Sequence, residues 1–446
     1  MSTKHSSRKA ISKTMSVVVG VIILIAVVAG VLIYMSSRAP PTTTPTTPTT
    51  TPTTTKPTIE KVKIGIIEPL TGSYAVFGQE AVDAARLIAD IINNELGGVS
   101  SLGGAKLELY VEDAGTSPDS AALATERLVS NYRPHVILGA YISRLTAAVA
   151  EVTEREKIPL VMDALVDWLT EKGWNYVFRI APRASTHGKS AVDFVLQMAQ
   201  KTNMPIRTVL ILHEDSIFGT TVANGIRSEL IAKGIIPNET ITYAYTITDF
   251  GPIISRIRDL NPDVIFSVPY FSDGILFAKA LQASGIKVKF VAGAGGCGYT
   301  DPDSIREAGT AVEYFTNTYS YNPARQTEWN KRVVQAFQQK YGKLPTEAAG
   351  IIFYSLMFVY EGLEKAGRMF PQDPLNPDNL RAAFLSLDLN DNNSKAAQLY
   401  PTGKIKLAAN GENLYGGTAI LQVIGGQPKV IWPEAEAGVT PVFPRP

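Results

Sequence analysis

Two kinds of apolar run alternate along the chain from about residue 60 onward. Short stretches rich in β-branched residues, of which 62–67 is the first, are typical of buried parallel strands. Longer stretches with helical character follow them, beginning with 79–94. Strands that alternate with helices at this spacing predict a parallel, doubly wound α/β sheet with right-handed crossovers.

The alternation runs through once and then restarts. The first set spans 61–180, and the second begins with a helix near 183 and a strand at 208–213. The restart predicts a second lobe of the same architecture. Beyond 319 the sequence predicts helices without new alternating strands, at 327–341, 346–367 and 379–387. Such helices must cover an existing sheet, so we expect the chain to return to the first lobe.

These patterns, with the N-terminal segments described next, predict six parts of the chain. They are a tail at 1–14, a membrane anchor at 15–35, a linker at 36–59, a first lobe at 60–181 plus 317–414, a second lobe at 182–316 plus 415–433, and a C-terminal tail at 434–446.

The N-terminal segments indicate attachment to a membrane. Residues 1–14 carry four Lys or Arg and no acid, and 15–35 carry no charge and are rich in Val, Ile, Ala and Gly. About 20 such residues span a bilayer as a helix, with the basic flank on the cytoplasmic side. A cleaved signal peptide is the alternative, although its apolar core is usually shorter. The Thr/Pro-rich linker predicts an extended stalk that holds the body on the extracellular face.

Composition narrows the class of protein further. The formal net charge of +1 gives no reason to expect nucleic acid as a partner. A single cysteine excludes an intramolecular disulfide and a cysteine metal cluster. The sequence contains no G-x-S-x-G, H-E-x-x-H, C-x-x-C or G-x-x-x-x-G-K-[ST] motif. We therefore predict a protein without catalytic activity, metal or cofactor.

The stretch 63–78, KIGIIEPLTGSYAVFG, predicts a strand, a turn and the entry to a helix. Pro69 ends the strand because it has no N–H for the ladder. A turn at the carboxyl end of a first strand is where open α/β sheets bind ligands. The stretch lacks G-x-G-x-x-G, so it does not predict a dinucleotide site.

Five segments in this order resemble the extracellular solute-binding proteins of the branched-chain amino-acid ABC importers. They are IGIIEPLTGSYAVFGQEAVDAARLIADIIN (64–93), VEDAGTSPDSAALATERLVSN (111–131), VILGAYISRLTAAVAEVTEREKIPLV (136–161), HEDSIFGTTVANGIRSEL (213–230), and DFGPIISRIRDLNPDVIFSV (249–268) with ALQASGIKVKFVAGAG (280–295). The resemblance covers nearly the whole body from about 61 to 432. The stalk on a membrane anchor resembles the archaeal variants.

The resemblance implies a type I periplasmic-binding-protein fold, with two doubly wound lobes joined by three crossovers and a cleft between them. It implies capture of a small solute by hinge closure and delivery to ABC permease and ATPase subunits. The solute would be a branched-chain or other apolar amino acid, or a related amide or carboxylate. The alternative is a ligand-sensing receptor ectodomain of the same fold that works with a separate signalling partner.

The resemblance also implies which residues hold the solute. The turn 141–146 would hold a carboxylate, with Ser143 as the anchoring hydroxyl; the alternative is that Ser143 only caps its helix. The next turn departs from the family, because Asp163, Ala164 and Leu165 stand where a Gly-Ala-Thr type segment is expected. Leu165 removes a hydroxyl. Asp163 adds a charge that either pairs with Arg144 or, like Arg144 itself, faces the ligand.

A second departure bears on the kind of solute. Amino-acid binders of the family hold the ammonium with an acid in the loop that reads AGAGG at 292–296 here, and this loop has none. Either Asp163 or Asp273 replaces it, or the solute is not an α-amino acid. Phe77, Phe218 and Tyr270 match pocket positions of the family and predict apolar walls for a flat or apolar solute.

Overall fold

The computed structural model describes residues 26–27, 29, 34, 59–296 and 298–446. The expected tail and anchor, and all but the last residue of the expected stalk, lie outside these residues apart from the four isolated positions. Across the part of the chain that is described, no helix has both the length and the apolarity needed to cross a bilayer.

The first sheet has five parallel strands in the order β2-β1-β3-β4-β5. They are β1 (Lys61–Glu68), β2 (Lys106–Asp113), β3 (Val136–Gly139), β4 (Leu160–Met162) and β5 (Val177–Arg179). The central strand β1 is apolar on both faces because helices cover both sides of the sheet. The expected α/β class with parallel strands is confirmed.

Helices α2 (Ala75–Asp90), α3 (Pro118–Tyr132) and α4 (Ser143–Glu156) connect these strands. Ser117 caps α3: its side chain accepts from the Ser120 amide, with Pro118 in the first turn. The α2 helix begins four residues earlier than expected, so that Gly78 lies inside it rather than before it. A side chain at Gly78 would overlap the Pro69 carbonyl, so glycine allows the helix to pass close to the strand end.

The second sheet has seven strands in the order β14-β13-β10-β9-β8-β6-β7. Its parallel part comprises β6 (Val209–Glu214), β7 (Glu239–Tyr243), β8 (Val264–Val268), β9 (Phe290–Ala294) and β10 (Thr316–Tyr319). The antiparallel strands β13 (Ala419–Ile424) and β14 (Gln427–Trp432) extend it at one edge. The helices that precede or join the parallel strands are α5 (Ala184–Lys201), α6 (Ile217–Ala232), α7 (Gly251–Leu260), α8 (Ser272–Ser284) and α9 (Pro302–Ala308).

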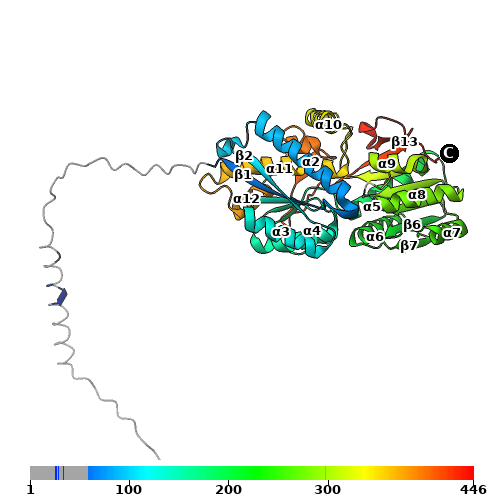
Figure 1. The fold of residues 1–446 in the computed structure, drawn as a ribbon, viewed down its shortest axis with the longest axis horizontal. Coiled ribbons are helices and arrows are strands. Elements are labelled where there is room, and N and C mark those ends of the chain that lie inside the picture. The colour runs from blue at the N-terminus through cyan, green and yellow to red at the C-terminus, as the bar shows by residue number, and fades with distance from the viewer. Residues whose placement is uncertain (1–25, 28, 30–33, 35–58, 297) are drawn as a thin grey trace, which may run out of the picture. The chain divides into compact units, whose positions relative to one another are not determined.

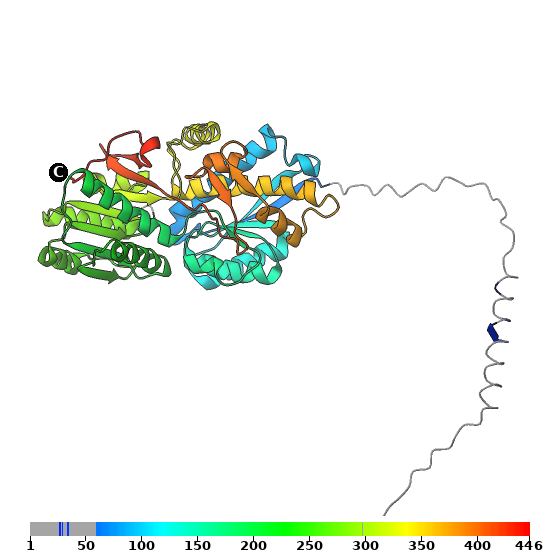
Figure 2. The same ribbon diagram turned by 180° about the vertical axis from the view of Figure 1, so that it is seen from behind.

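After β10 the chain returns to the first lobe. It forms α10 (Glu328–Tyr341), α11 (Glu347–Met369), α12 (Pro377–Leu385), α13 (Lys395–Leu399) and the short pair β11 (Asp388–Asn390) and β12 (Lys404–Lys406). The long helix α11 packs against α2 and β3, and Figures 1 and 2 show the yellow and orange segments beside the blue and cyan ones. The first lobe is therefore completed by a part of the chain remote in sequence.

One expected boundary between the lobes is wrong by a strand. The prediction begins the return to the first lobe at residue 317, within β10. The structure pairs β10 with β9 and β13, so this strand belongs to the second sheet. The sequence of β10, TNTY, has three polar residues, whereas buried strands are usually apolar runs. The sequence pattern therefore does not indicate that β10 is a central strand.

Two of the three crossovers lie against each other. Arg179 at the end of β5 exchanges backbone hydrogen bonds with Gly411 and Asn413. Its buried guanidinium is paired with Glu412, and it donates to the carbonyls of Leu165 and Val166. A buried, fully bonded ion pair fixes the geometry of both segments at the point where they leave the first lobe.

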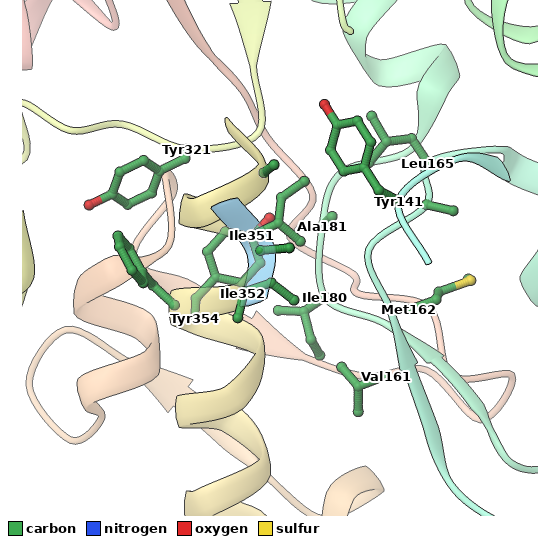
Figure 3. Packing of buried hydrophobic residues seen from close by; sticks show 14 of the residues in the cluster. Tyr141, Val161, Met162, Leu165, Ile180, Ala181, Tyr321, Ile351, Ile352 and Tyr354 are labelled. Atoms are coloured by element: carbon green, nitrogen blue, oxygen red, sulfur yellow. The ribbon is translucent and has the colours of Figure 1, made fainter. Parts of the chain in front are cut away.

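The apolar core of the first lobe lies between the sheet and α11. Figure 3 shows Ile351, Ile352 and Tyr354 of α11 on one side and Val161 and Met162 of β4 on the other. All five side chains are buried. The carboxyl ends of the first-sheet strands lie beside this core. The residues that follow the strands therefore start from tightly packed positions.

His135 is a half-buried acceptor immediately before β3. Its Nδ1 accepts a hydrogen bond from the Lys63 amide at 3.0 Å. Burial, and then the charge of Lys63, lowers the pKa of His135 to about 4. The fold therefore holds the ring neutral over a range in which an unfolded histidine, of pKa about 6.5, takes up a proton.

We predict that this histidine weakens the fold in acid. As the pH falls from about 6.5 to 4, the unfolded state gains a proton that the folded state does not, which costs up to about 3 kcal/mol. The His135→Asn variant keeps an acceptor atom in the same place and does not titrate. Urea unfolding at pH 7.5 and pH 4.5 should show a smaller loss of stability for this variant than for the wild type; equal losses would contradict the account.

Candidate functional site

The parallel strands of the two sheets follow the same order. In each sheet the chain first adds a strand toward one edge and then adds the later strands toward the other edge, so the strand order reverses at one place. In the first sheet the reversal lies between β1 and β3, and in the second between β6 and β8. The carboxyl edge at such a reversal leaves a crevice between the helices that follow the two strands, where α/β proteins bind ligands. Residues after β3 and β4 in the first lobe and after β6, β8 and β9 in the second line one cavity.

The first-lobe wall is built on the turn between β3 and α4. Tyr141 has a φ of 44°, a left-handed conformation that is costly for a residue with a side chain. Its amide donates to Asp163 Oδ1 at 2.5 Å, which holds the turn in place. Ser143, 2% exposed, is the first residue of α4, where the backbone N–H groups have no partner within the helix.

Ser143 is not the cap of its helix. Ile142 occupies the N-cap position of α4 and makes no side-chain hydrogen bond there. The interpretation of Ser143 as a capping residue is therefore wrong. A hydroxyl beside free amide donors at the positive end of a helix dipole is suited to receive a carboxylate.

The second-lobe wall is aromatic. Phe218, at the start of α6, lies 5.2 Å from Tyr270 between ring centroids. Ser216 caps α6 by accepting from the Phe218 amide. This bond fixes the backbone from which the Phe218 ring extends. Gly295 and Gly296 have left-handed φ angles of 73° and 72°, and a side chain at Gly295 would press on the Phe218 ring. At Gly295, therefore, the Phe218 ring occupies the space that a larger residue would need.

The two walls enclose a small cavity. It is lined by Tyr141, Ser143, Asp163, Leu165, Phe218, Tyr270 and Gly296 and has a volume of about 10 Å³. That is about the space of a single water molecule. A solute of several heavy atoms can enter only if the lobes separate or the aromatic side chains turn.

The structure brings five of the nine predicted site residues to this cavity and places four elsewhere. The five are Ser143, Asp163, Leu165, Phe218 and Tyr270. Ala164 is buried beside them without lining the cavity. The other three have structural partners that explain their position, described next.

Phe77 does not face the cavity directly, contrary to the prediction. Its ring stacks on Tyr141 at 4.9 Å and meets Phe271 of the second lobe edge-on at 6.3 Å. It supports the Tyr141 side chain from behind. Figure 3 shows Tyr141 beside Leu165, and both line the cavity.

Arg144 does not pair with Asp163. Its guanidinium donates to Tyr74 Oη at 3.3 Å and to the Thr116 carbonyl at 3.2 Å. It also lies 4.8 Å from the centre of the Tyr245 ring, which belongs to the second lobe. Arg144 therefore contributes to contact between the lobes rather than to the cavity wall.

Asp273 acts as a support for Tyr270. Its Oδ2 accepts from the Tyr243 hydroxyl at 2.7 Å and from the Tyr270 amide at 3.2 Å. Burial raises the pKa of Asp273 to about 6. Glu214, at the end of β6, is similarly engaged by the amide and hydroxyl of Ser216, and burial raises its pKa to about 7.

Two residues at the cavity were not predicted from the sequence. They are Tyr141, which lines the cavity, and Glu68, which is buried near Asp163. Glu68 is the last residue of β1 and is fully buried. Burial first, and then the nearby charge of Asp163, raises the pKa of Glu68 well above its usual range. A charged residue that directly continues the apolar run 64–67 was the available signal. Among the described residues, no group of three or more His, Cys, Asp or Glu is arranged to hold a metal ion.

Comparison with known proteins identifies the architecture. The family model described as periplasmic binding protein matches residues 61–427. Leu/Ile/Val-binding protein homolog 8 of Brucella abortus (strain 2308) is 27% identical over 393 residues, which cover 84% of this chain and 91% of that protein.

Two solved structures share the fold. The leucine binding protein LivK of Thermotoga maritima MSB8 has a TM-score of 0.70 at 21% identity, covering 83% of this chain and 97% of that one. A solute binding protein of an ABC transporter from Rhodopseudomonas palustris BisB5, solved with 3,4-dihydroxy benzoic acid, has a TM-score of 0.68 at 24% identity, covering 83% and 95%. These relatives are binding proteins by description. The chain, matched over most of its length, belongs to the periplasmic binding protein family.

Proposed function

We propose that this chain is the extracytoplasmic substrate-binding subunit of an ABC importer of the branched-chain amino-acid type. The observation that supports this most strongly is the pair of facing strand-order reversals, whose loops together line one cavity. The named relatives, which include a leucine binding protein and Leu/Ile/Val-binding homologues, agree with it.

The solute is a small molecule with an apolar part and a carboxylate. Phe218, Tyr270 and Leu165 supply apolar walls, and Ser143 with the first amides of α4 supplies a carboxylate site. A pocket of apolar walls with a few fixed polar groups is the common form of a small-molecule site. Branched-chain and other apolar amino acids fit this description, as do related amides and aromatic carboxylates.

Capture proceeds by hinge closure. Aromatic and cationic side chains already meet across the cleft: Tyr74 with Tyr270 at 5.5 Å, Phe77 with Phe271, and Arg144 with Tyr245. The lobes therefore contact each other directly in this arrangement. A solute that contacts both walls favours this arrangement over the open one.

The apolar segment at 15–35 anchors the protein, and the Thr/Pro stalk holds the body on the extracellular face beside permease and ATPase subunits. An anchored binding protein of this kind resembles archaeal members of the family. A receptor ectodomain with a separate signalling partner is the second candidate for the same fold. Co-purification from membranes with a permease, rather than with a kinase, distinguishes the two.

A thermal-shift screen tests the proposed function. Apolar amino acids, their amides and aromatic carboxylates should be compared at equal concentration, because a ligand stabilises the fold according to its excess over its dissociation constant. At least one member of the panel should raise the melting temperature in a dose-dependent way. A panel without any effect would count against the proposal.

The Ser143→Ala variant should bind the solute more weakly by about 1–3 kcal/mol, because a buried hydroxyl that bonds a charged group is lost. Calorimetry gives the comparison directly. The Ser130→Ala variant, on the far end of α3, is the matched control and should bind as the wild type does. Equal affinity of Ser143→Ala and wild type would remove Ser143 from the site.

The Tyr245→Ala variant should favour the open arrangement. It removes the ring that Arg144 meets across the cleft, a contact worth about 0.5–1 kcal/mol at an exposed position. Small-angle scattering without solute should then give a larger radius of gyration than for the wild type. The Tyr415→Ala variant removes a comparable ring that contacts Lys404, and should leave the radius unchanged. No difference between the two variants would show that the contact does not bias closure.

A further inference from the structure

Along the crossover that follows β10, the chain passes from the second lobe to the first at Ser320. Tyr319, the last residue of β10, pairs with Ala419 in the second sheet. On the other side, Tyr321 is buried against the first lobe, and its ring meets Phe353 of α11 edge-on at 5.8 Å between centroids. Ser320, 0% exposed, lies between these two anchored residues. On this crossover, a change in the angle between the lobes must therefore be absorbed at or beside Ser320.

Ser320 is hydrogen-bonded to each lobe through a different group. Its amide donates to Oε1 of Glu347, the first residue of α11 in the first lobe, at 2.6 Å. Its hydroxyl lies 3.0 Å from Nε2 of His187, which belongs to α5 in the second lobe. Both partners are fully buried, so water does not compete for either bond. The residue at the change of lobe is therefore restrained from both sides.

Glu347 connects Ser320 to the first-lobe wall of the cavity. Its Oε2 accepts from the Tyr141 hydroxyl at 3.1 Å, and Tyr141 lines the cavity. The Tyr141 backbone is already held by the bond from its amide to Asp163. A solute that displaces the Tyr141 ring therefore acts on the same carboxylate that holds the Ser320 amide.

His187 connects Ser320 to the second-lobe wall. Its Nδ1 lies 2.8 Å from the Thr318 hydroxyl, and that hydroxyl accepts from the Gly295 amide at 2.8 Å. The next residue, Gly296, lines the cavity. The His187 ring thus lies between the residue at the change of lobe and the loop that forms part of the opposite wall.

The His187 ring is suited to join two hydroxyl groups. Burial lowers the pKa of His187, whereas the charge of Glu347 acts in the opposite direction. A neutral imidazole has one N–H donor and one acceptor nitrogen, and a hydroxyl can both donate and accept. Both ring nitrogens can therefore be satisfied by Thr318 and Ser320 in either tautomer.

We propose that Ser320 is the pivot of this crossover, and that His187 and Glu347 are positioning residues that couple the pivot to the two walls of the cavity. The assignment rests on the proposed solute-binding function, because it names the residues through which an occupied cavity biases the hinge. Neither His187 nor Glu347 lines the cavity. Each acts through another residue, His187 through the Gly295 loop and Glu347 through Tyr141.

The His187→Leu variant tests the pivot on the full-length chain without any solute. Leucine removes both ring nitrogens and leaves an apolar side chain in their place. Amide hydrogen exchange in the peptides that cover Gly295 and Ser320 should become about threefold faster or more, as expected when buried hydrogen bonds are lost. Small-angle scattering should give a larger radius of gyration than for the wild type, because the pivot is less restrained.

Two conservative variants separate a positioning role from a purely structural one. The His187→Gln variant places an amide group near the position of Nε2, so it should keep the Ser320 bond and the wild-type radius. The His187→Asn variant places its amide group near Nδ1, so it should keep the Gly295 peptide protected while Ser320 exchanges faster and the radius increases.

The Ser267→Ala variant is the matched control, because it removes a buried hydroxyl that lies 2.6 Å from the Tyr299 hydroxyl within the second lobe. It should leave the radius and the exchange of the Ser320 peptide at wild-type values. The same response from all three His187 variants, or a wild-type response from His187→Leu, would overturn the proposal.

A double-variant cycle tests the coupling between the walls. Tyr141→Phe removes only the hydroxyl that bonds Glu347, and it is combined with His187→Leu. Leucine, phenylalanine and benzoate serve as probes in calorimetry. For a probe that binds the wild type, the affinity loss of the double variant should be at least about threefold smaller than the product of the two single losses, because both variants release the same pivot.

An affinity loss equal to that product would overturn the coupling. If none of the three probes binds the wild type, the proposed function loses support, whereas hydrogen exchange and scattering still decide whether Ser320 is the pivot.

Discussion

The order of strands in the two parallel sheets is the constraint on which the site depends. A parallel sheet places all its strand ends on one edge, and a reversal of order leaves a crevice at that edge. Here the strand order of each parallel sheet reverses next to its first strand, β1 or β6. The crossovers place the carboxyl edges of the two sheets opposite each other. Every residue of the cavity lies within a few positions of a strand end or a helix start, so backbone topology rather than loop length positions the site.

Within the first lobe, one hydrogen bond connects the two turns of the crevice. The Tyr141 amide donates to Asp163, so the left-handed turn before α4 is held by the residue that follows β4. Gly139 and Gly78 make this packing possible, because side chains at either place would overlap the end of β1 or the turn after it. Asp163, the amino end of α4 and the end of β1 are therefore held in one packed unit.

The fold was largely predictable from the sequence because several parallel strands, such as β1, β3 and β8, are apolar runs that alternate with helices. β10 was assigned to the wrong lobe because TNTY is polar, although all four residues are buried between neighbouring strands. Ser143, Phe218 and Tyr270, which the resemblance implies as site residues, line the cavity, and their role in binding stays a prediction. Phe77, Arg144 and Asp273 did not line the cavity because each has a partner from another segment: Tyr141, Tyr245 and Tyr243. Such tertiary partners leave no pattern in a sequence.

The most direct measurement is a crystal structure of the chain grown with the solute that stabilises it most. The account predicts a solute between the two sheets, in contact with Ser143 on the first lobe and with Phe218 and Tyr270 on the second. A solute that touches one lobe only, or that lies away from the ends of β3 and β6, would contradict the account.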